Sequence, residues 1–225
     1  MEEDKYQIDQ TLEGHTGTVY KAIEIKENEL ISLSYDKTMK IWKLNNENTF
    51  ECFLNVFFQY YNSYCNILKI NENEFVTSSC SDSCLKFWNA KNYKNIATIN
   101  SISLEWTYDL MCILDNDLLC VGGKDSKGFY LIKISTHQLI KNVLGPKTIY
   151  SIKECIDGLF LCSILNEKGN YSLAKYEYEF ENKNLKKIVE NEKSHDNNCI
   201  YAAIELNRRT IASCSEDNTI KLWEI

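Results

Sequence analysis

The sequence IASCSEDNTIKLWEI at residues 211–225 decides the fold of this chain. A run of small and β-prone residues enters a Glu-Asp-Asn turn, and a second alternating run ends in a tryptophan, which predicts two strands and a tight turn. The same pattern stands at residues 30–44 (LISLSYDKTMKIWKL) and 76–90 (VTSSCSDSCLKFWNA). In each copy a turn aspartate lies six residues before the tryptophan; the pairs are Asp36 and Trp42, Asp82 and Trp88, and Asp217 and Trp223. Three copies of one hairpin indicate a repeat protein.

The tryptophans give the period of the repeat. Trp42 and Trp88 are 46 residues apart, and Trp88 and Trp223 are 135 apart, which leaves room for two degenerate copies between them. These copies place Ile132 and Tyr176 at the tryptophan position. A further strand precedes each hairpin and a less regular segment follows it, so each period supplies the four antiparallel strands of a β-propeller blade. We expect a single all-β domain over residues 1–225, with repeats at 14–58, 59–102, 103–145, 146–193 and 194–225.

The repeats resemble those of the WD-repeat (WD40) family, through the three hairpins that end in tryptophan and the Gly14-His15 pair before the first of them. In that family a histidine, a Ser or Thr of the second strand, the turn aspartate and the tryptophan form a hydrogen-bonded tetrad. The resemblance implies a five-bladed WD40-type propeller with two full tetrads and one partial set. The residues implied are His15, Ser34, Asp36 and Trp42; His195, Ser215, Asp217 and Trp223; and Asp82 with Trp88.

The two ends of the chain complement each other. The last repeat supplies three strands, and the alternating segment KYQIDQTL at residues 5–12 supplies one. We expect this N-terminal strand to complete the fifth blade and to close the ring, as in the WD-repeat family, because pairing removes two open sheet edges. The alternatives are an open propeller completed by the strands of a partner and a piece of a longer protein.

Composition restricts the class of protein. The chain is 44% hydrophobic and 25% charged, which is typical of soluble globular proteins. It contains no apolar run of the roughly 20 residues that cross a bilayer, and its acidic N-terminus is unlike a signal peptide. Ten scattered cysteines without a C-x-x-C pair favour reduced thiols and a cytoplasmic or nuclear location. The net charge of −7 argues against binding to nucleic acid and favours a basic partner.

The sequence gives little support for catalysis. The resemblance assigns His15 and His195 to structural tetrads, so the His/Asp/Ser trio recurs within a repeat and ends on an indole, unlike a catalytic triad. No glycine-rich phosphate loop is present. Cys80 and Cys84 have no second pair at zinc-ligand spacing, so we expect no metal and no cofactor.

A column of tyrosines marks one face of the expected propeller. Aligned first strands stack tyrosines in four of the five repeats. In the WD-repeat family this column, the residue two before it and the residue before the turn aspartate surround the mouth of the central channel. These positions hold Thr18, Tyr20, Tyr35, Ser81, Trp106, Tyr108, Lys124, Tyr150, Tyr201 and Glu216. Two interpretations stay open: the tyrosines anchor a partner, or they pack between blades.

The resemblance implies a non-enzymatic scaffold or adaptor, a monomeric ring within a complex, that binds a peptide or protein loop on this top face. The alternative is a constitutive subunit of a larger assembly of the coat, ciliary or ubiquitin-ligase type. An enzyme is disfavoured because the rim positions supply mainly Tyr, Thr and Ser. The charged segment at residues 176–193 predicts either a solvated hairpin or a docking extension.

Overall fold

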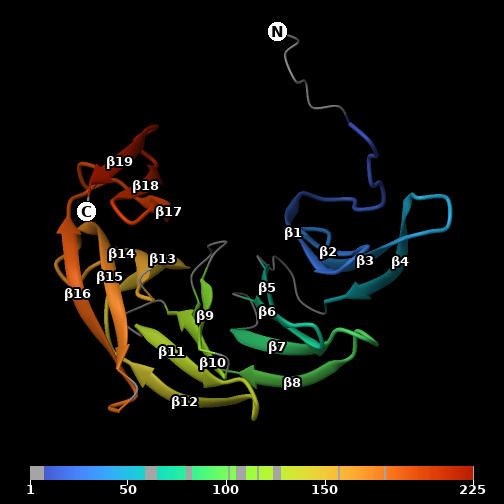
Figure 1. The fold of residues 1–225 in the computed structure, drawn as a ribbon, viewed down its shortest axis with the longest axis horizontal. Helices are drawn as coiled ribbons and strands as arrows, with labels where there is room; N and C mark the ends of the chain where they lie inside the picture. The colour runs from blue at the N-terminus through green and yellow to red at the C-terminus, as the bar shows by residue number, and fades with distance from the viewer. Residues whose placement is uncertain are drawn as a thin grey trace, which may run out of the picture.

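The chain forms five antiparallel sheets in the computed structural model. The structure describes residues 8–58, 65–79, 83–100, 102–104, 110–115, 117–123, 128–156, 158–179 and 181–224. Within these residues each sheet consists of strands that are consecutive in sequence, and the sheets stand side by side in an arc (Figure 1). The predicted all-β architecture of five blades is therefore confirmed.

The strands follow one another along the chain in five groups. The first blade contains β1 (Val19–Lys26), β2 (Glu29–Ser34), β3 (Thr38–Leu44) and β4 (Phe50–Phe57). The second contains β5 (Cys65–Asn71), β6 (Glu74–Ser79), β7 (Cys84–Asn89) and β8 (Asn95–Asn100). The third contains β9 (Met111–Asp115), β10 (Leu118–Gly122), β11 (Phe129–Lys133) and β12 (Gln138–Val143). The fourth contains β13 (Thr148–Glu154), β14 (Phe160–Leu165), β15 (Tyr171–Glu179) and β16 (Asn184–Glu192). The fifth contains β17 (Ile200–Asn207), β18 (Thr210–Ser215) and β19 (Ile220–Glu224).

The hairpin turns use residues that tolerate left-handed backbone. Asn28, between β1 and β2, has φ of 64°, and Asn218, between β18 and β19, also has φ of 64°. Asparagine enters this region more easily than most residues because its short amide can bond to the local backbone. The tight turns between alternating runs that the sequence predicts thus have a local cause.

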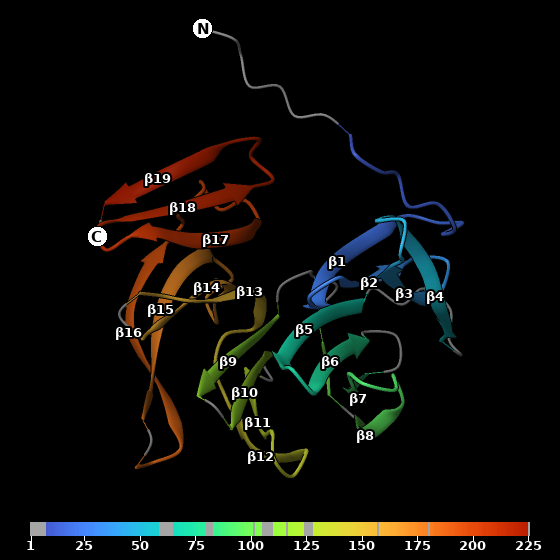
Figure 2. The same ribbon diagram turned by 45° about the vertical axis from the view of Figure 1, so that its right-hand side comes forward.

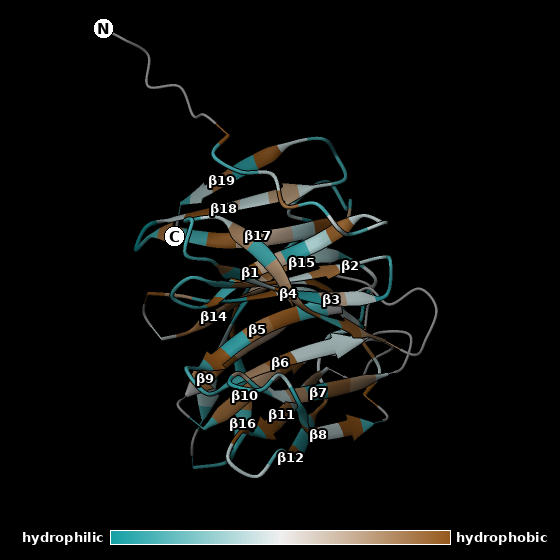
Figure 3. Cartoon of the chain, turned by 90° about the vertical axis from the view of Figure 1, so that its right-hand side faces the viewer, coloured by the Kyte–Doolittle hydropathy of each residue, from teal (hydrophilic) through white to brown (hydrophobic). Residues whose placement is uncertain are grey.

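Apolar side chains hold neighbouring blades together. One buried cluster joins the first two blades, with Ile31 and Phe75 at its centre, and a second joins blades two and three. A third cluster, which includes Phe129 and Phe160, joins blades three and four, and a fourth joins blades four and five. Most hydrophobic residues lie in strands, while hydrophilic residues predominate in the loops (Figure 3). A single blade cannot bury its apolar faces alone, so stability comes from stacking.

The register of the strands tests the two degenerate repeats. Trp42 pairs with Leu30 of the preceding strand. Ile132 pairs with Leu119 of its preceding strand in the same way, and Tyr176 pairs with Phe160. Both residues therefore occupy the tryptophan position, as their spacing predicts.

The first strand of each blade lies innermost in the arc and the last lies outermost (Figure 1). Contacts between neighbouring blades run through β1, β5, β9, β13 and β17 in that order. The first and fifth blades stand at the two ends of the arc, apart from one another in both views (Figures 1 and 2).

The expected closure by the N-terminal strand is not found in the described residues. The fifth blade has three strands, and residues 8–12 form no strand; residues 5–7 lie outside the described part of the chain. The side chain of Gln10 instead binds the first blade: its Nε2 donates to the carbonyl of Phe50, and its Oε1 accepts from the Phe50 N–H, both at 2.8 Å. These bonds place the segment beside β4, away from β19.

The charged segment at residues 176–193 belongs to a regular hairpin. β15 and β16 are nine residues long and pair from Ser172 with Glu192 to Glu179 with Asn184. The segment therefore extends the outer edge of the fourth blade as paired strands.

Candidate binding face

The first blade contains a continuous chain of hydrogen bonds between side chains. The indole N–H of Trp42 donates to Ser32 Oγ at 2.8 Å, and Ser32 Oγ lies 2.7 Å from His15 Nε2. His15 Nδ1 lies 2.8 Å from Asp36 Oδ2. Since an indole only donates and a carboxylate only accepts, every group is satisfied when Ser32 donates to Nε2 and Nδ1–H donates to Asp36. The four residues fix the turn of this blade against the preceding loop.

The serine of this network is Ser32, and the prediction of Ser34 is wrong. The register of β2 and β3 brings the indole of Trp42 to Ser32, while Ser34 lies two residues further on, beside the turn. There its hydroxyl donates to the Gly17 carbonyl at 3.1 Å and accepts from the Asp36 N–H at 3.1 Å.

The fifth blade repeats this geometry. The indole of Trp223 donates to Ser213 Oγ at 2.8 Å, and His195 Nε2 lies 2.7 Å from the same oxygen. His195 Nδ1 lies 2.8 Å from Asp217 Oδ2. Ser213 thus takes the role predicted for Ser215, whose hydroxyl donates to the Cys199 carbonyl at 2.7 Å.

The pKa values of both network aspartates are lowered from the ordinary value of 3.8. Burial raises the pKa of Asp36, but hydrogen bonds from Thr38, the Thr16 backbone and His15 outweigh burial and lower the pKa to about 2. The pKa of Asp217 is lowered to about 2 because burial is outweighed in the same way by the threonine and histidine of its own blade.

The second blade keeps part of the network. The indole N–H of Trp88 donates to Thr77 Oγ1 at 2.9 Å, so a threonine replaces the serine. Asp82 lies outside the described residues.

The histidines are held by structural contacts. Both ring nitrogens of His15 and of His195 lie within hydrogen-bonding distance of network partners. His137 joins neighbouring blades, since its Nε2 pairs with Glu74 and its ring lies 4.7 Å from that of Phe87. In the described residues, no group of three or more His, Cys, Asp or Glu side chains is placed to hold a metal ion.

The predicted face lies where the first strand begins beside the turn of the hairpin. The N–H of Tyr35 donates to the Thr18 carbonyl at 2.8 Å, and in the fifth blade the N–H of Glu216 donates to the Cys199 carbonyl at 2.9 Å. These bonds bring the start of the first strand and the residue before the turn aspartate together at one end of the blade. First strands are innermost in the arc (Figure 1).

Tyrosines gather in two groups on this face. In the first blade, Tyr20 and Tyr35 meet edge to face with ring centroids 6.2 Å apart, and Tyr35 is 45% exposed. At the other end of the arc, Tyr150 lies 5.8 Å from Tyr171, and Tyr201 is 56% exposed. Each group contains at least one partly buried tyrosine beside an exposed one. Some tyrosines of this face therefore pack within the protein while others are accessible to a partner.

Tyr171 is a member of this face that the sequence alignment missed. It begins β15 directly after the hairpin turn, in a column that the alignment of first strands does not include. The negative charge of Glu216 raises the pKa of Tyr201, with burial and then Cys199 and Tyr171 as smaller causes. Acidic and phenolic groups therefore adjoin where blades four and five meet.

Several predicted residues of the face lie outside the described part of the chain. They are Ser81, Trp106, Tyr108 and Lys124.

Known proteins share parts of this sequence and its fold. Residues 7–43 and 187–224 match the family WD40 (WD domain, G-beta repeat), which covers the first and last repeats. The WD40 β-propeller domain of Doa1 aligns with a TM-score of 0.67 and 22% identity, over 96% of this chain and 67% of that chain. A chain of the mitotic checkpoint complex aligns with a TM-score of 0.71 and 15% identity, over 96% of this chain and 66% of that one. A search of curated proteins gave no significant match.

The fold and the side-chain networks thus define a repeat-built β-propeller. Residues 7–43 and 187–224 match the WD-repeat model, and the chain has the fold of the WD40 β-propellers, as the resemblance implies. It spans about two thirds of the length of the two structures to which it is similar. No helix in the described residues is long and apolar enough to cross a membrane.

Proposed function

We propose that this chain is a non-enzymatic interaction scaffold that holds a peptide or loop of a partner protein against its tyrosine face. The observation that carries the proposal is the exposure of Tyr35 and Tyr201 at one end of the first and last blades, each beside further tyrosines. Tyrosine buries a large area at small entropic cost and keeps a polar tip for hydrogen bonding, so it anchors interfaces.

The charge of the chain favours a basic partner. The net charge is −7, and Glu216 is exposed on the tyrosine face. Complementary charge speeds association and excludes like-charged partners. The WD40 propeller fold generally serves as a protein-interaction scaffold, and the bonded histidines of the first and last blades support a role without catalysis. No disulfide joins the cysteines whose side chains the structure describes, which supports a reducing compartment, cytoplasmic or nuclear.

A capture experiment with matched variants tests this proposal. Wild type is compared with Tyr35→Ser/Tyr201→Ser and with the control Phe57→Ser, which removes an aromatic ring, 73% exposed, from the outer strand β4. All three proteins are required to have the same thermal midpoint. We expect partners held by wild type and by the control to be lost from the double variant. Equal capture by all three proteins contradicts a binding role for the tyrosine face.

A second candidate function is a subunit whose open arc is completed by a partner. The observation that favours it is the edge strand β19, where Ile220 is 75% and Leu222 is 67% exposed and no fourth strand pairs within the described residues. Exposed apolar residues on an unpaired edge are a ready template for another chain. The variant Ile220→Lys/Leu222→Lys in the same experiment separates the candidates. Loss of partners from this variant alone favours a subunit role.

A further inference from the structure

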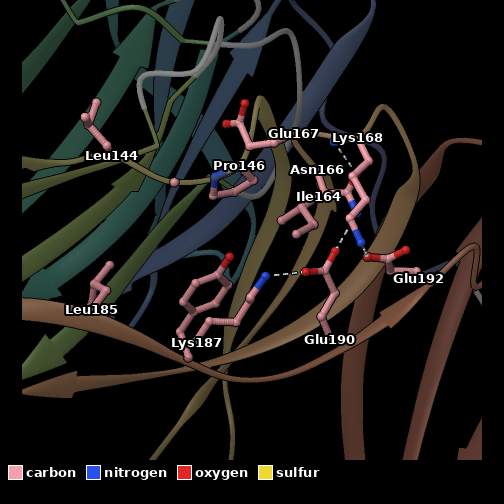
Figure 4. A pocket seen from close by; sticks show the side chains of 12 residues that line it. Leu144, Pro146, Ile164, Asn166, Glu167, Lys168, Leu185, Lys187, Glu190 and Glu192 are labelled. Carbon is pink, nitrogen blue, oxygen red and sulfur yellow. Dashed lines mark hydrogen bonds and ion pairs between the residues drawn. The ribbon is translucent and has the colours of Figure 1, made fainter.

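A cavity of about 340 Å³ is lined by residues of the fourth blade and of the segment that joins β12 to β13. Its apolar walls are formed by Leu144, Pro146, Ile164, Tyr176 and Leu185. Charged side chains form the opposite wall, where the turn after β14 meets β16 (Figure 4). This volume is at the lower end of the range for binding pockets, about 300–1,000 Å³, and suits a single side chain.

Residues at the histidine and tryptophan positions of the fourth blade line the cavity. The network histidine lies five residues before Tyr20 in the first blade and six before Tyr201 in the fifth. The corresponding positions before Tyr150 in the fourth blade hold Gly145 and Leu144. Tyr176 stands at the tryptophan position. Neither position holds a histidine, and a phenol takes the place of the indole.

The charged wall is largely neutralised by its own ion pairs. Glu190 accepts from Asn166 Nδ2 at 2.7 Å and pairs with Lys187. Lys168 Nζ lies 2.6 Å from Glu192 Oε1. Both lysines of the cavity are therefore occupied by carboxylates and are poorly placed to attract an anion.

Two polar side-chain groups that line the cavity have no hydrogen-bond or ion-pair partner among the described residues. Glu167 is exposed and forms no ion pair or hydrogen bond through its carboxylate with the described residues. Tyr176 is only 5% exposed, and its ring stacks on Phe160 with centroids 5.7 Å apart. Its hydroxyl makes no hydrogen bond to any residue that the structure describes, although the side chain lines the cavity. Burial, then the charges of Cys162 and Glu190, hold the pKa of Tyr176 far above its usual range, so the phenol stays neutral.

We propose that this cavity binds the side chain of a lysine or arginine from a partner polypeptide. The apolar wall receives the aliphatic stem, and the phenol oxygen of Tyr176 and the carboxylate of Glu167 receive the cationic head. An anion would meet three glutamates against two paired lysines, and a purely apolar side chain would leave the Tyr176 hydroxyl without a partner. The pocket shares no residue with the tyrosine face, so the two surfaces can be tested separately.

The test uses N-acetyl-arginine amide as the probe and its citrulline analogue as the uncharged match. Both are titrated into ¹⁵N-labelled protein, and the backbone amide resonances of Gly145 and Lys168 report binding at the cavity. We expect a dissociation constant of about 1–10 mM for the arginine probe, as for a fragment of this size, and at least fivefold weaker binding of citrulline.

Matched variants assign the contacts. Tyr176→Phe removes only the hydroxyl and is expected to weaken binding about tenfold, because a hydrogen bond to a charged group is lost. Glu167→Gln is expected to weaken binding about threefold. Glu47→Gln makes the same charge change at an exposed glutamate of the loop after β3 and serves as the control. Glu167 is exposed, so its variant provides the test if Tyr176→Phe fails to fold.

Several outcomes overturn the proposal. They are equal shifts from arginine and citrulline, shifts that lie elsewhere than the cavity, an equal loss in Glu47→Gln, and no saturation by about 50 mM probe. Tyr201→Ser is expected to leave the arginine titration unchanged, so failure of this pocket is distinguishable from failure of the tyrosine face.

Discussion

The variant Ser32→Ala tests the hydrogen-bonded network of the first blade. Ser32 Oγ accepts from the Trp42 indole at 2.8 Å and lies 2.7 Å from His15 Nε2, and both partners are shielded from water. Replacement by alanine removes one oxygen and leaves two buried polar groups unpaired. An unsatisfied buried group costs about 1–3 kcal/mol, so we expect a loss of about 3 kcal/mol of the free energy of unfolding.

The neighbouring serine provides the matched control. Ser34 also makes two hydrogen bonds, but both go to backbone groups beside a turn whose next residue, Tyr35, is exposed. Ser34 is itself buried, but the residues of its two partners, Gly17 and Asp36, are partly exposed, so water can reach the backbone groups that lose the hydroxyl. Ser34→Ala is therefore expected to cost about 1 kcal/mol, the usual net value of one hydrogen bond.

The assay is urea and thermal unfolding of wild type and the two variants, followed by tryptophan fluorescence. For a chain of this length a loss of 1 kcal/mol lowers the thermal midpoint by about 2–4 °C, so Ser32→Ala is expected to melt about 6–12 °C below wild type. Ser34→Ala is expected to melt only a few degrees below. Equal losses, or a greater loss in Ser34→Ala, would refute the assignment of Ser32 to the network.

Two further predictions concern buried charges. The pKa of Asp36 is lowered to about 2 in the folded protein from an ordinary 3.8, so its stabilising effect is complete above pH 4 and is lost as the pH falls toward 2. Urea midpoints between pH 5 and pH 2.5 should therefore fall more steeply for wild type than for Asp36→Asn, and parallel slopes would contradict this. Lys175 and Glu205 form a buried pair between blades four and five, with Nζ and Oε1 3.1 Å apart. In urea unfolding, Lys175→Met is expected to lower the free energy of unfolding by about 3–5 kcal/mol, because it leaves the buried carboxylate of Glu205 unpaired. The double variant Lys175→Met/Glu205→Leu is expected to lose less. A double variant as unstable as the single one would show that the unpaired carboxylate is not the cause.

The repeats were predictable from sequence because successive tryptophan positions, from Trp42 to Trp223, stay 44 to 47 residues apart. The spacing from Trp42 and Trp88 places Ile132 and Tyr176 correctly, and the register confirms both. In a repeat fold, the number of residues from one repeat to the next predicts where a residue lies, even where its side chain differs from that of the other repeats.

The choice between two serines was not predictable in the same way. Ser32 and Ser34 are two residues apart, so both lie on the same face of β2. Only the pairing of β2 with β3, which sets Ser32 opposite Lys40 and two positions from the partner of Trp42, decides which hydroxyl the indole reaches. Register of this kind follows from the packed structure and not from local pattern.

The position of the N-terminal segment shows a second limit. Alternation at residues 5–12 predicts a strand, but alternation does not choose the sheet to which a strand is added. In the structure Gln10 binds the backbone of Phe50 at the edge of the first blade. The segment is held through the side-chain amide of one residue, Gln10, and a single contact of this kind leaves no periodic pattern in the sequence.

The fourth blade explains why the cavity was invisible to motif analysis. A hydrogen-bonded network that loses one member leaves its other members unsatisfied, so partial loss is more costly than complete loss. Accordingly the imidazole, hydroxyl and indole are all absent from this blade: Cys162 stands at the serine position, Tyr176 at the tryptophan position, and neither Leu144 nor Gly145 supplies an imidazole. Aromatic stacking of Tyr176 on Phe160 supplies the packing that the network supplies elsewhere. The hydroxyl of Tyr176 makes no hydrogen bond to the described residues, and Tyr176 lines the cavity. A motif search records such a blade as degenerate, whereas the residues at its altered positions line a cavity and Tyr176 supplies a group to bind a ligand.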